Sequence, residues 1–199
     1  ELSFVYTGNK VPRMEQLDII ELVLSEIKQF STGIPKDEIS LILEHLLDHS
    51  VEISPPVYLE IDRELFIKTL FEILDNAHTY SEKPSQIKVS AYIENDQFYL
   101  SISDQGIGYE NEGGNRLLQP FIRGEKSYLY KAFGLGVGLA KVKSFLLLQN
   151  GNFAIHQQEK GTLFLVNLPL MERKVDKFAL DIDQYRILIS QNGKEDLKL

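Results

Sequence analysis

Two predicted β-hairpins constrain the fold of this chain more than any other feature of its sequence. Their strands are expected at residues 87–93, 98–103, 153–157 and 163–168. The turn residues Asn95-Asp96 join the first pair, and a turn containing Lys160-Gly161 joins the second. Because a hairpin joins antiparallel strands, the sheet is expected to be antiparallel or mixed, which argues against a doubly wound parallel fold.

Helical spacing of apolar residues predicts three helices that accompany this sheet. They are expected at residues 17–30, 63–80 and 138–149. Asp62 can cap the second helix, and Asn150-Gly151 ends the third. Alternation at residues 57–61 predicts a further strand, whereas residues 39–43 could form a strand or part of a helix. This order of elements indicates an α+β fold with helices on one face of the sheet.

The composition is that of one ordinary globular domain with small appendages. Of the 199 residues, 43% are hydrophobic and 25% are charged, and no apolar run of about 18 residues could span a membrane. The absence of cysteine excludes disulfides and thiolate metal sites and fits a cytosolic protein. No export signal is recognisable, and a net charge of -8 argues against a general nucleic-acid binder.

The predicted helix 63–80 carries two different faces. Apolar side chains that should face the core lie at Phe66, Leu70, Ile73, Leu74 and Ala77. Glu72, Asn76 and Tyr80 are spaced four apart and therefore share another face. An asparagine oxygen suits Mg²⁺, and a carboxylate one turn away could orient or deprotonate a hydroxyl or water. The alternative is a solvated face on which Lys68 and Glu72 form an ordinary ion pair.

Glycines concentrate in residues 104–137, a long segment predicted to be irregular and therefore functional or mobile. It begins with the sequence DQGIG, directly after a strand. The Asp104 carboxylate can accept a hydrogen bond from an exocyclic amine, and Gly106 and Gly108 let the backbone approach a ligand closely. The alternative is a plain turn.

The same segment ends in GLGVGL, which places Gly134, Gly136 and Gly138 directly before a helix. Amides at a helix N-terminus form a site for anions such as phosphate, although neither the Walker pattern nor the dinucleotide fingerprint is present. Basic side chains that could add charge precede it at Arg123, Lys126 and Lys131. The alternative for the glycines is a flexible hinge, and the alternative for the basic residues is a solvated loop.

Taken in order, these segments resemble the ATP-binding domain shared by histidine kinases, gyrase, heat-shock chaperones and mismatch-repair ATPases. The matching segments are LFEILDNAHTYS (N box), SISDQGIG (G1 box), PFIRG (F box), GLGVGLAKVK (G2 box) and GTLFLVNLP (G3 strand). They keep the family's order and spacing over about residues 17–169. The phrases QPFIRGE and GLAKVKSFLLLQNGN make the resemblance closest to sensor histidine kinases.

The resemblance implies a two-layer α/β sandwich that binds Mg-ATP and transfers the γ-phosphoryl group to a histidine on a separate dimerisation domain. It implies that Asn76 holds Mg²⁺, that Asp104 reads adenine and that Glu72 polarises the acceptor imidazole. The remaining nucleotide contacts would come from Tyr80, Gly106, Gly108, Arg123, Gly134, Gly136, Gly138 and Leu139. Residues 109–133 would form a mobile lid that orders when nucleotide binds.

By the same resemblance, residues 1–15 would end a dimerisation helix and its linker, and residues 16–170 would form the catalytic domain. Residues 171–199 would be a C-terminal extension or the start of a further domain. The histidines of the chain are expected to be structural or surface residues, with no phosphoacceptor among His45, His49, His78 and His156. The intact protein is expected to be a homodimer that serves a response regulator. It would be cytoplasmic or membrane-anchored, with no membrane contact by this chain.

Two positions depart from the family pattern. Thr79 stands where the N box commonly has a lysine that helps hold phosphate, and Leu135 stands where the G2 box usually has a small or hydroxylated residue. Both departures favour the alternative of a non-catalytic nucleotide-binding module. A serine kinase or ATP hydrolase of the same superfamily is the other alternative.

Overall fold

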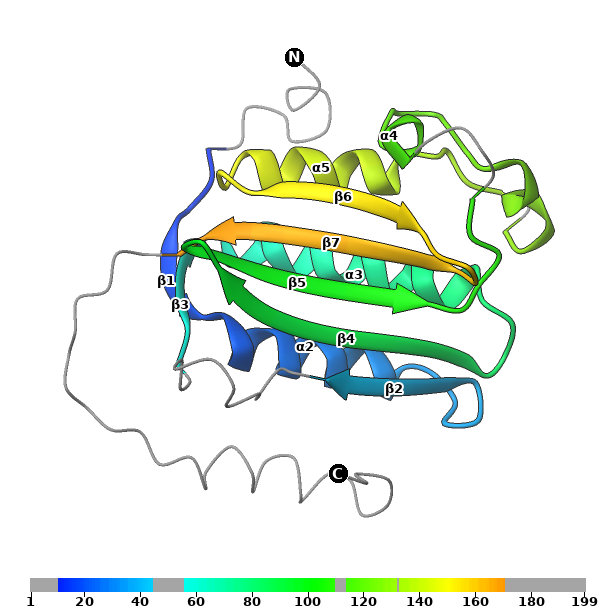
Figure 1. The fold of residues 1–199 in the computed structure, drawn as a ribbon, viewed down its shortest axis with the longest axis horizontal. Coiled ribbons are helices and arrows are strands. Elements are labelled where there is room, and N and C mark those ends of the chain that lie inside the picture. The colour runs from blue at the N-terminus through cyan, green and yellow to red at the C-terminus, as the bar shows by residue number, and fades with distance from the viewer. Residues whose placement is uncertain (1–10, 45–55, 110–113, 132, 171–199) are drawn as a thin grey trace.

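A five-stranded mixed sheet forms one layer of the molecule (Figure 1). The computed structural model describes residues 11–44, 56–109, 114–131 and 133–170. In the order β2-β4-β5-β7-β6, the strands are β2 (Ile39–Glu44), β4 (Ser85–Glu94), β5 (Gln97–Asp104), β7 (Thr162–Pro169) and β6 (Asn152–Gln157). β2 pairs with β4 in parallel, and the other neighbouring strands are antiparallel, which confirms the predicted sheet.

Three helices cover one face of this sheet and form the second layer (Figure 1). They are α2 (Ile19–Thr32), α3 (Arg63–Thr79) and α5 (Gly138–Leu147). The core lies between the layers: Phe98, Leu100 and Ile102 of β5 are at most 1% exposed and belong to the same buried cluster as Phe66 and Ile73 of α3. Alternate residues of a strand share one face, so β5 presents every second side chain to the helices. The predicted α/β sandwich is confirmed.

A short two-stranded ribbon opens the described part of the fold. β1 (Glu15–Asp18) pairs antiparallel with β3 (Tyr58–Ile61). The helix predicted from residue 17 therefore starts at Ile19 instead, because Leu17 and Asp18 belong to β1. Asp18 serves as the helix cap, since its Oδ1 accepts a hydrogen bond of 3.0 Å from the amide of Ile20.

Asp62 caps α3 as predicted and also ties distant segments together. Its Oδ1 accepts a hydrogen bond from the amide of Leu65 (3.0 Å), and its Oδ2 accepts one from the amide of Arg13 (2.7 Å). Its own amide donates to Oε1 of Gln149 (2.8 Å), just beyond the end of α5. This buried network fixes the start of α3 against the end of α5, and so positions the two helices that carry much of the site.

The first predicted hairpin turn is confirmed by its backbone. Asn95 and Asp96 have φ angles of 49° and 57°, the left-handed conformations that a two-residue primed turn requires. Residues 39–44 form a strand rather than a helix because they pair with β4. The third helix ends at Leu147, two residues before its predicted end. The segment 104–137, predicted to be irregular, also contains α4 (Gly114–Leu117) and the 3₁₀ helix η1 (Glu125–Leu129).

Some expectations fall on residues that the structure does not describe. His45 and His49 lie outside the described residues, as do residues 1–10 and 171–199, so the assignments of the two ends of the chain stay predictions. Within the part of the chain that is described, no helix is long and apolar enough to cross a membrane.

Candidate functional site

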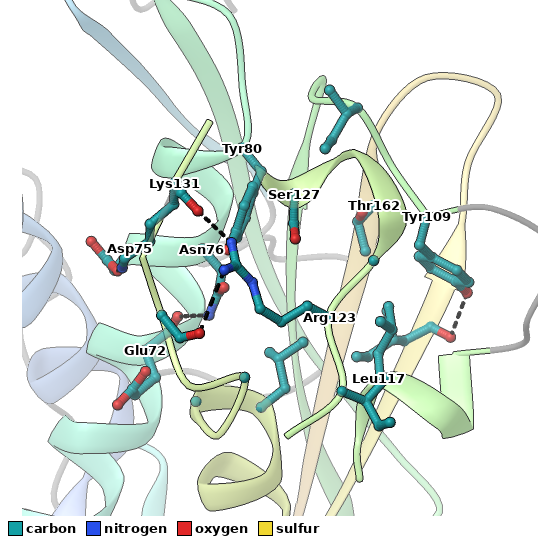
Figure 2. A pocket seen from close by; sticks show the side chains of 18 of the residues that line it. Glu72, Asp75, Asn76, Tyr80, Tyr109, Leu117, Arg123, Ser127, Lys131 and Thr162 are labelled. Atoms are coloured by element: carbon teal, nitrogen blue, oxygen red, sulfur yellow. Dashed lines mark hydrogen bonds and ion pairs between the residues drawn. The ribbon is translucent and has the colours of Figure 1, made fainter. Parts of the chain in front are cut away.

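A cavity of about 270 Å³ lies between α3, the start of α5 and the segment that precedes α5 (Figure 2). Its wall contains every site residue expected from the sequence except Gly106. Those residues are Glu72, Asn76, Tyr80, Asp104, Gly108, Arg123, Gly134, Gly136, Gly138 and Leu139. The fold therefore gathers at one place groups that are far apart in the chain.

The polar face of α3 forms one side of the cavity (Figure 2). Asn76 donates a hydrogen bond from Nδ2 to the backbone oxygen of Glu72 (2.5 Å), so the amide nitrogen is engaged and Oδ1 is the atom left for a ligand. The Glu72 carboxylate lies 3.6 Å from Nζ of Lys141 on α5. The alternative pairing of Glu72 with Lys68 is wrong, because Lys68 pairs with Glu64 at 2.5 Å.

Asp104 lies at the end of β5 and is only 4% exposed. Its Oδ1 accepts hydrogen bonds from the amides of Gly106 (2.7 Å) and Thr162 (3.3 Å). Burial raises the pKa of this carboxyl from 3.8 to about 6, while the two backbone hydrogen bonds act in the opposite direction. Both amides donate to Oδ1, so Oδ2 is the atom available to a donor on a ligand.

The raised pKa of Asp104 predicts a specific dependence of stability on pH. A raised pKa means that the folded protein binds a proton more tightly than the unfolded chain, so this group stabilises the fold at low pH. That contribution is lost as the pH rises from about 4 to 6, and the buried carboxylate then costs about 3 kcal/mol at neutral pH. Asp104→Asn should remove this dependence, which denaturant unfolding at pH 4.5 and 7 would measure.

The exposed turn residue Asp96 provides the matched control for that measurement. Its backbone is left-handed, with φ of 57°, which asparagine tolerates well. Asp96→Asn should therefore keep the pH dependence of the wild type. If Asp104→Asn also kept it, the buried carboxyl would not be the group that titrates.

Two glycines allow the backbone to pack closely around Asp104. A side chain at Gly161, where φ is 83°, would place its Cβ 2.0 Å from the backbone oxygen of Asp104. A Cβ at Gly106 would lie 2.3 Å from the backbone oxygen of Tyr80. Gly106 therefore serves the packing of the protein against itself and does not line the cavity, whereas Gly161 is a site-supporting residue that sequence reasoning treated only as a turn.

The N-terminus of α5 forms a second wall of the cavity. Its N-cap residue, Val137, makes no side-chain capping hydrogen bond, so the side chain at the cap position does not satisfy the first amides of the helix. Gly136 has φ of 66°, and a Cβ there would lie 2.6 Å from the backbone oxygen of Ile122. At Gly138 a Cβ would lie 2.6 Å from Oε2 of Glu72. Glycines at these positions thus let the helix start lie close to both α3 and the preceding loop.

Residues 114–131, a described part of the segment 109–133 that is expected to form a lid, place basic side chains in the cavity wall (Figure 2). Arg123 donates from Nη2 to the backbone oxygen of Lys131 and from Nη1 to that of Gly134 (3.4 Å). Its guanidinium lies 4.1 Å from the ring centre of Tyr128. Lys131 reaches across to α3, where its Nζ lies 3.3 Å from Oδ2 of Asp75. This segment is thus attached to α3 by an ion pair.

Sequence reasoning did not find several residues of the cavity wall. They include Asp75, Tyr109, Leu117, Ser127, Lys141 and Thr162. Tertiary contacts place them: Thr162 reaches Asp104 where β7 runs beside β5, and Tyr109 donates its hydroxyl to the backbone oxygen of Ile155 on β6 (3.1 Å). Each of them lies in one of the matching boxes or in the expected lid, 109–133, but no pattern singled it out as a site residue.

One cavity thus brings together a buried carboxylate, an amide oxygen and the start of a helix, on a mixed sheet that helices cover on one face. Together these features define an ATP-binding class of protein. Residues 61–172 match the family of histidine kinase-, DNA gyrase B- and HSP90-like ATPases, and the chain belongs to that family. The resemblance seen in the sequence is confirmed.

Among the relatives, the chain is 30% identical to the autoinducer 2 sensor kinase/phosphatase LuxQ of Vibrio parahaemolyticus over 170 residues, which are 81% of this chain and 19% of that protein. It spans between 19% and 42% of the length of the curated relatives it matches. The catalytic domain of histidine kinase ThkA has the same fold, with a TM-score of 0.66 at 19% identity over 79% of this chain and 96% of that one. Full-length ShkA in complex with AMPPNP matches with a TM-score of 0.64 at 18% identity, over 86% of this chain and 34% of that one.

Proposed function

We propose that this chain is the ATP-binding catalytic domain of a sensor histidine kinase, and that it transfers the γ-phosphoryl group of ATP to a histidine on a separate dimerisation domain. The observation that carries the proposal is the polarity of one cavity. A buried carboxylate, Asp104, lies in its wall, and the uncapped start of α5 with the basic lid lies elsewhere in the same wall. A nucleotide has the matching polarity, with an amine-bearing base and an anionic phosphate chain.

The base would bind at Asp104. Its free Oδ2 can accept a hydrogen bond from the exocyclic amine of adenine, a position where guanine carries an oxygen and has nothing to donate. Apolar groups of the wall would pack against the rings, among them Ile107, Ile155 and Phe164. Tyr80, at the end of α3, would pack beside the nucleotide.

The phosphates would bind at the start of α5, where Gly134, Gly136 and Gly138 keep the backbone accessible. Arg123 would neutralise charge from the lid. Mg²⁺ fits Asn76, because it prefers hard oxygen ligands and usually takes only one or two from the protein. When bound, the ion would neutralise charge that develops on the phosphate oxygens during transfer.

Transfer would break the bond between the γ-phosphorus and its bridging oxygen and form a bond from that phosphorus to an imidazole nitrogen. Most of the catalysis would be positioning and charge neutralisation. Glu72 would orient the imidazole by accepting a hydrogen bond from its other ring nitrogen. Its contact with Lys141, 3.6 Å away, would hold the carboxylate near α5.

The relatives support this reading over its alternatives, because they are named as sensor kinases. By the same analogy, the intact protein would be a cytoplasmic or membrane-anchored homodimer that passes the phosphoryl group to a response regulator. A serine kinase, an ATP hydrolase or a non-catalytic module would need the same cavity. The non-catalytic module is favoured by Thr79 and by Leu135. Leu135 is 75% exposed and lines the cavity.

Phosphoryl transfer to a separate domain tests the proposal directly. The isolated chain with Mg²⁺ and γ-labelled ATP should acquire no stable label, because no acceptor histidine is expected within it. Adding the dimerisation domain of the intact protein as a second chain should yield label on that domain that is lost in acid and kept in base.

The stability of the label decides between the reaction classes. Acid-stable label would indicate a serine kinase, and release of phosphate without label would indicate an ATP hydrolase. Acid-labile label on any of the chain's own histidines would contradict the expectation that the acceptor lies elsewhere. Those histidines are His45, His49, His78 and His156.

A further inference from the structure

The lid contains a buried hydroxyl group for which the described protein offers no partner. Ser127 is 7% exposed, and its Oγ is the buried side-chain polar atom without a hydrogen bond among the described residues. Its backbone is satisfied, since its amide donates to the oxygen of Gly124 (3.0 Å) and its own oxygen accepts from the amide of Lys131 (3.0 Å). The unmet hydrogen bond therefore belongs to the side chain alone.

The other buried serines show how unusual this arrangement is. Ser81 donates to the backbone oxygen of Ala77 (2.8 Å), and Ser144 donates to that of Ala140 (3.0 Å). Ser85 shares a hydrogen bond of 2.7 Å with His78. Each of these three buried serines of the described residues thus finds a partner within the protein. A buried hydroxyl without one is costly, and such a group calls for an explanation.

The surroundings of Ser127 indicate what kind of group would satisfy it. The side chain is directed into the cavity from the lid and lines its wall (Figure 2). Four residues before it stands Arg123, and four residues after it Lys131, both of which line the same cavity. A hydroxyl donor in a wall that also holds two cations matches an anionic acceptor such as a phosphate oxygen. An apolar ring would satisfy neither the hydroxyl nor the cations, and an amine could donate to the hydroxyl but would not pair with the cations.

We infer that Ser127 is a nucleotide-contacting residue of the lid, which donates its hydroxyl hydrogen to the phosphate chain of the bound nucleotide. This inference rests on the proposed function and adds to it a neutral donor that the sequence pattern did not indicate. The hydroxyl is buried without a partner among the described residues, and a bound phosphate chain would give it one.

Ser127→Ala tests the inference by separating binding from stability. ATP affinity, measured by calorimetry with Mg²⁺, should fall about tenfold, the size of one hydrogen bond to a charged group. Affinity for adenosine, which has no phosphate, should stay within about twofold of the wild type. The melting temperature of the unliganded variant should stay the same or rise, because the substitution removes an unpaired buried hydroxyl.

Ser144→Ala provides the matched control, since Ser144 is buried, hydrogen-bonded within α5 and absent from the cavity wall. It should lower the melting temperature slightly and leave ATP affinity unchanged. Three results would overturn the inference alone: wild-type ATP affinity in Ser127→Ala, an equal loss for adenosine and ATP, or a fall in melting temperature like that of Ser144→Ala. A wild-type protein that binds no ATP would overturn the proposed function, and this inference with it.

Discussion

Asp104→Asn is expected to weaken ATP binding roughly 100-fold while leaving the unliganded protein at least as stable as the wild type. The amide can keep both backbone hydrogen bonds at Oδ1, from Gly106 and Thr162. Its nitrogen then replaces Oδ2 and presents a donor to the adenine amine, which is itself a donor. Stability does not fall, because the variant no longer buries a charge whose pKa the fold has raised to about 6.

Calorimetric titration and thermal unfolding of the same samples would check both halves of this prediction. Asp96→Asn, in the exposed turn between β4 and β5, should bind ATP like the wild type. Wild-type protein should also prefer ATP to GTP, because guanine has no amine at the corresponding position. Equal affinity for the two nucleotides would rule out the role of Asp104 in reading adenine, whatever the variant shows.

Asn76→Ala is expected to reduce phosphoryl transfer by roughly 100-fold or more and to abolish the effect of Mg²⁺ on ATP affinity. The reason is geometric: Nδ2 donates to the backbone oxygen of Glu72, so Oδ1 is the atom that can bind the ion. Affinity for adenosine should change little, since the base would bind at Asp104. ATP titrations with Mg²⁺ and with a chelator, beside a transfer assay, would measure these effects.

A second variant distinguishes metal binding from simple loss of a polar group. Asn76→Asp keeps the oxygen at Oδ1 and replaces Nδ2 with a second oxygen, so it cannot donate to the backbone oxygen of Glu72, and it places a further carboxylate beside Asp75. It should therefore bind Mg²⁺ without ATP more readily, yet melt at a lower temperature.

Asn167→Ala is the matched control, because Asn167 donates to Gln97 at 3.2 Å on the sheet, outside the cavity wall. If it reduced transfer as much as Asn76→Ala, the role of Asn76 in binding Mg²⁺ would be untenable.

Most of the fold could be predicted from the sequence, because its elements have strong local causes. Period-two burial in β5, the cap at Asp62 and the left-handed turn at Asn95-Asp96 all follow from short-range chemistry. At two places where the predicted secondary structure was wrong or open, pairing with a neighbouring strand decided it. Leu17 has helical neighbours but pairs with Leu59, and residues 39–44 became a strand by pairing with β4. Local propensity is a weak preference that such pairing overrides.

The sequence by itself determined where the proposed nucleotide site should lie, because boxes of fixed spacing bring defined groups to strand ends and helix starts. What each group does within the protein was decided by tertiary structure alone. Packing made Gly106 a contact for Tyr80, and the approach of β7 to β5 gave Asp104 its second amide. The folded lid left the Ser127 hydroxyl buried and unpaired. Burial and hydrogen-bond satisfaction depend on segments far apart in the chain, so no local pattern encodes them.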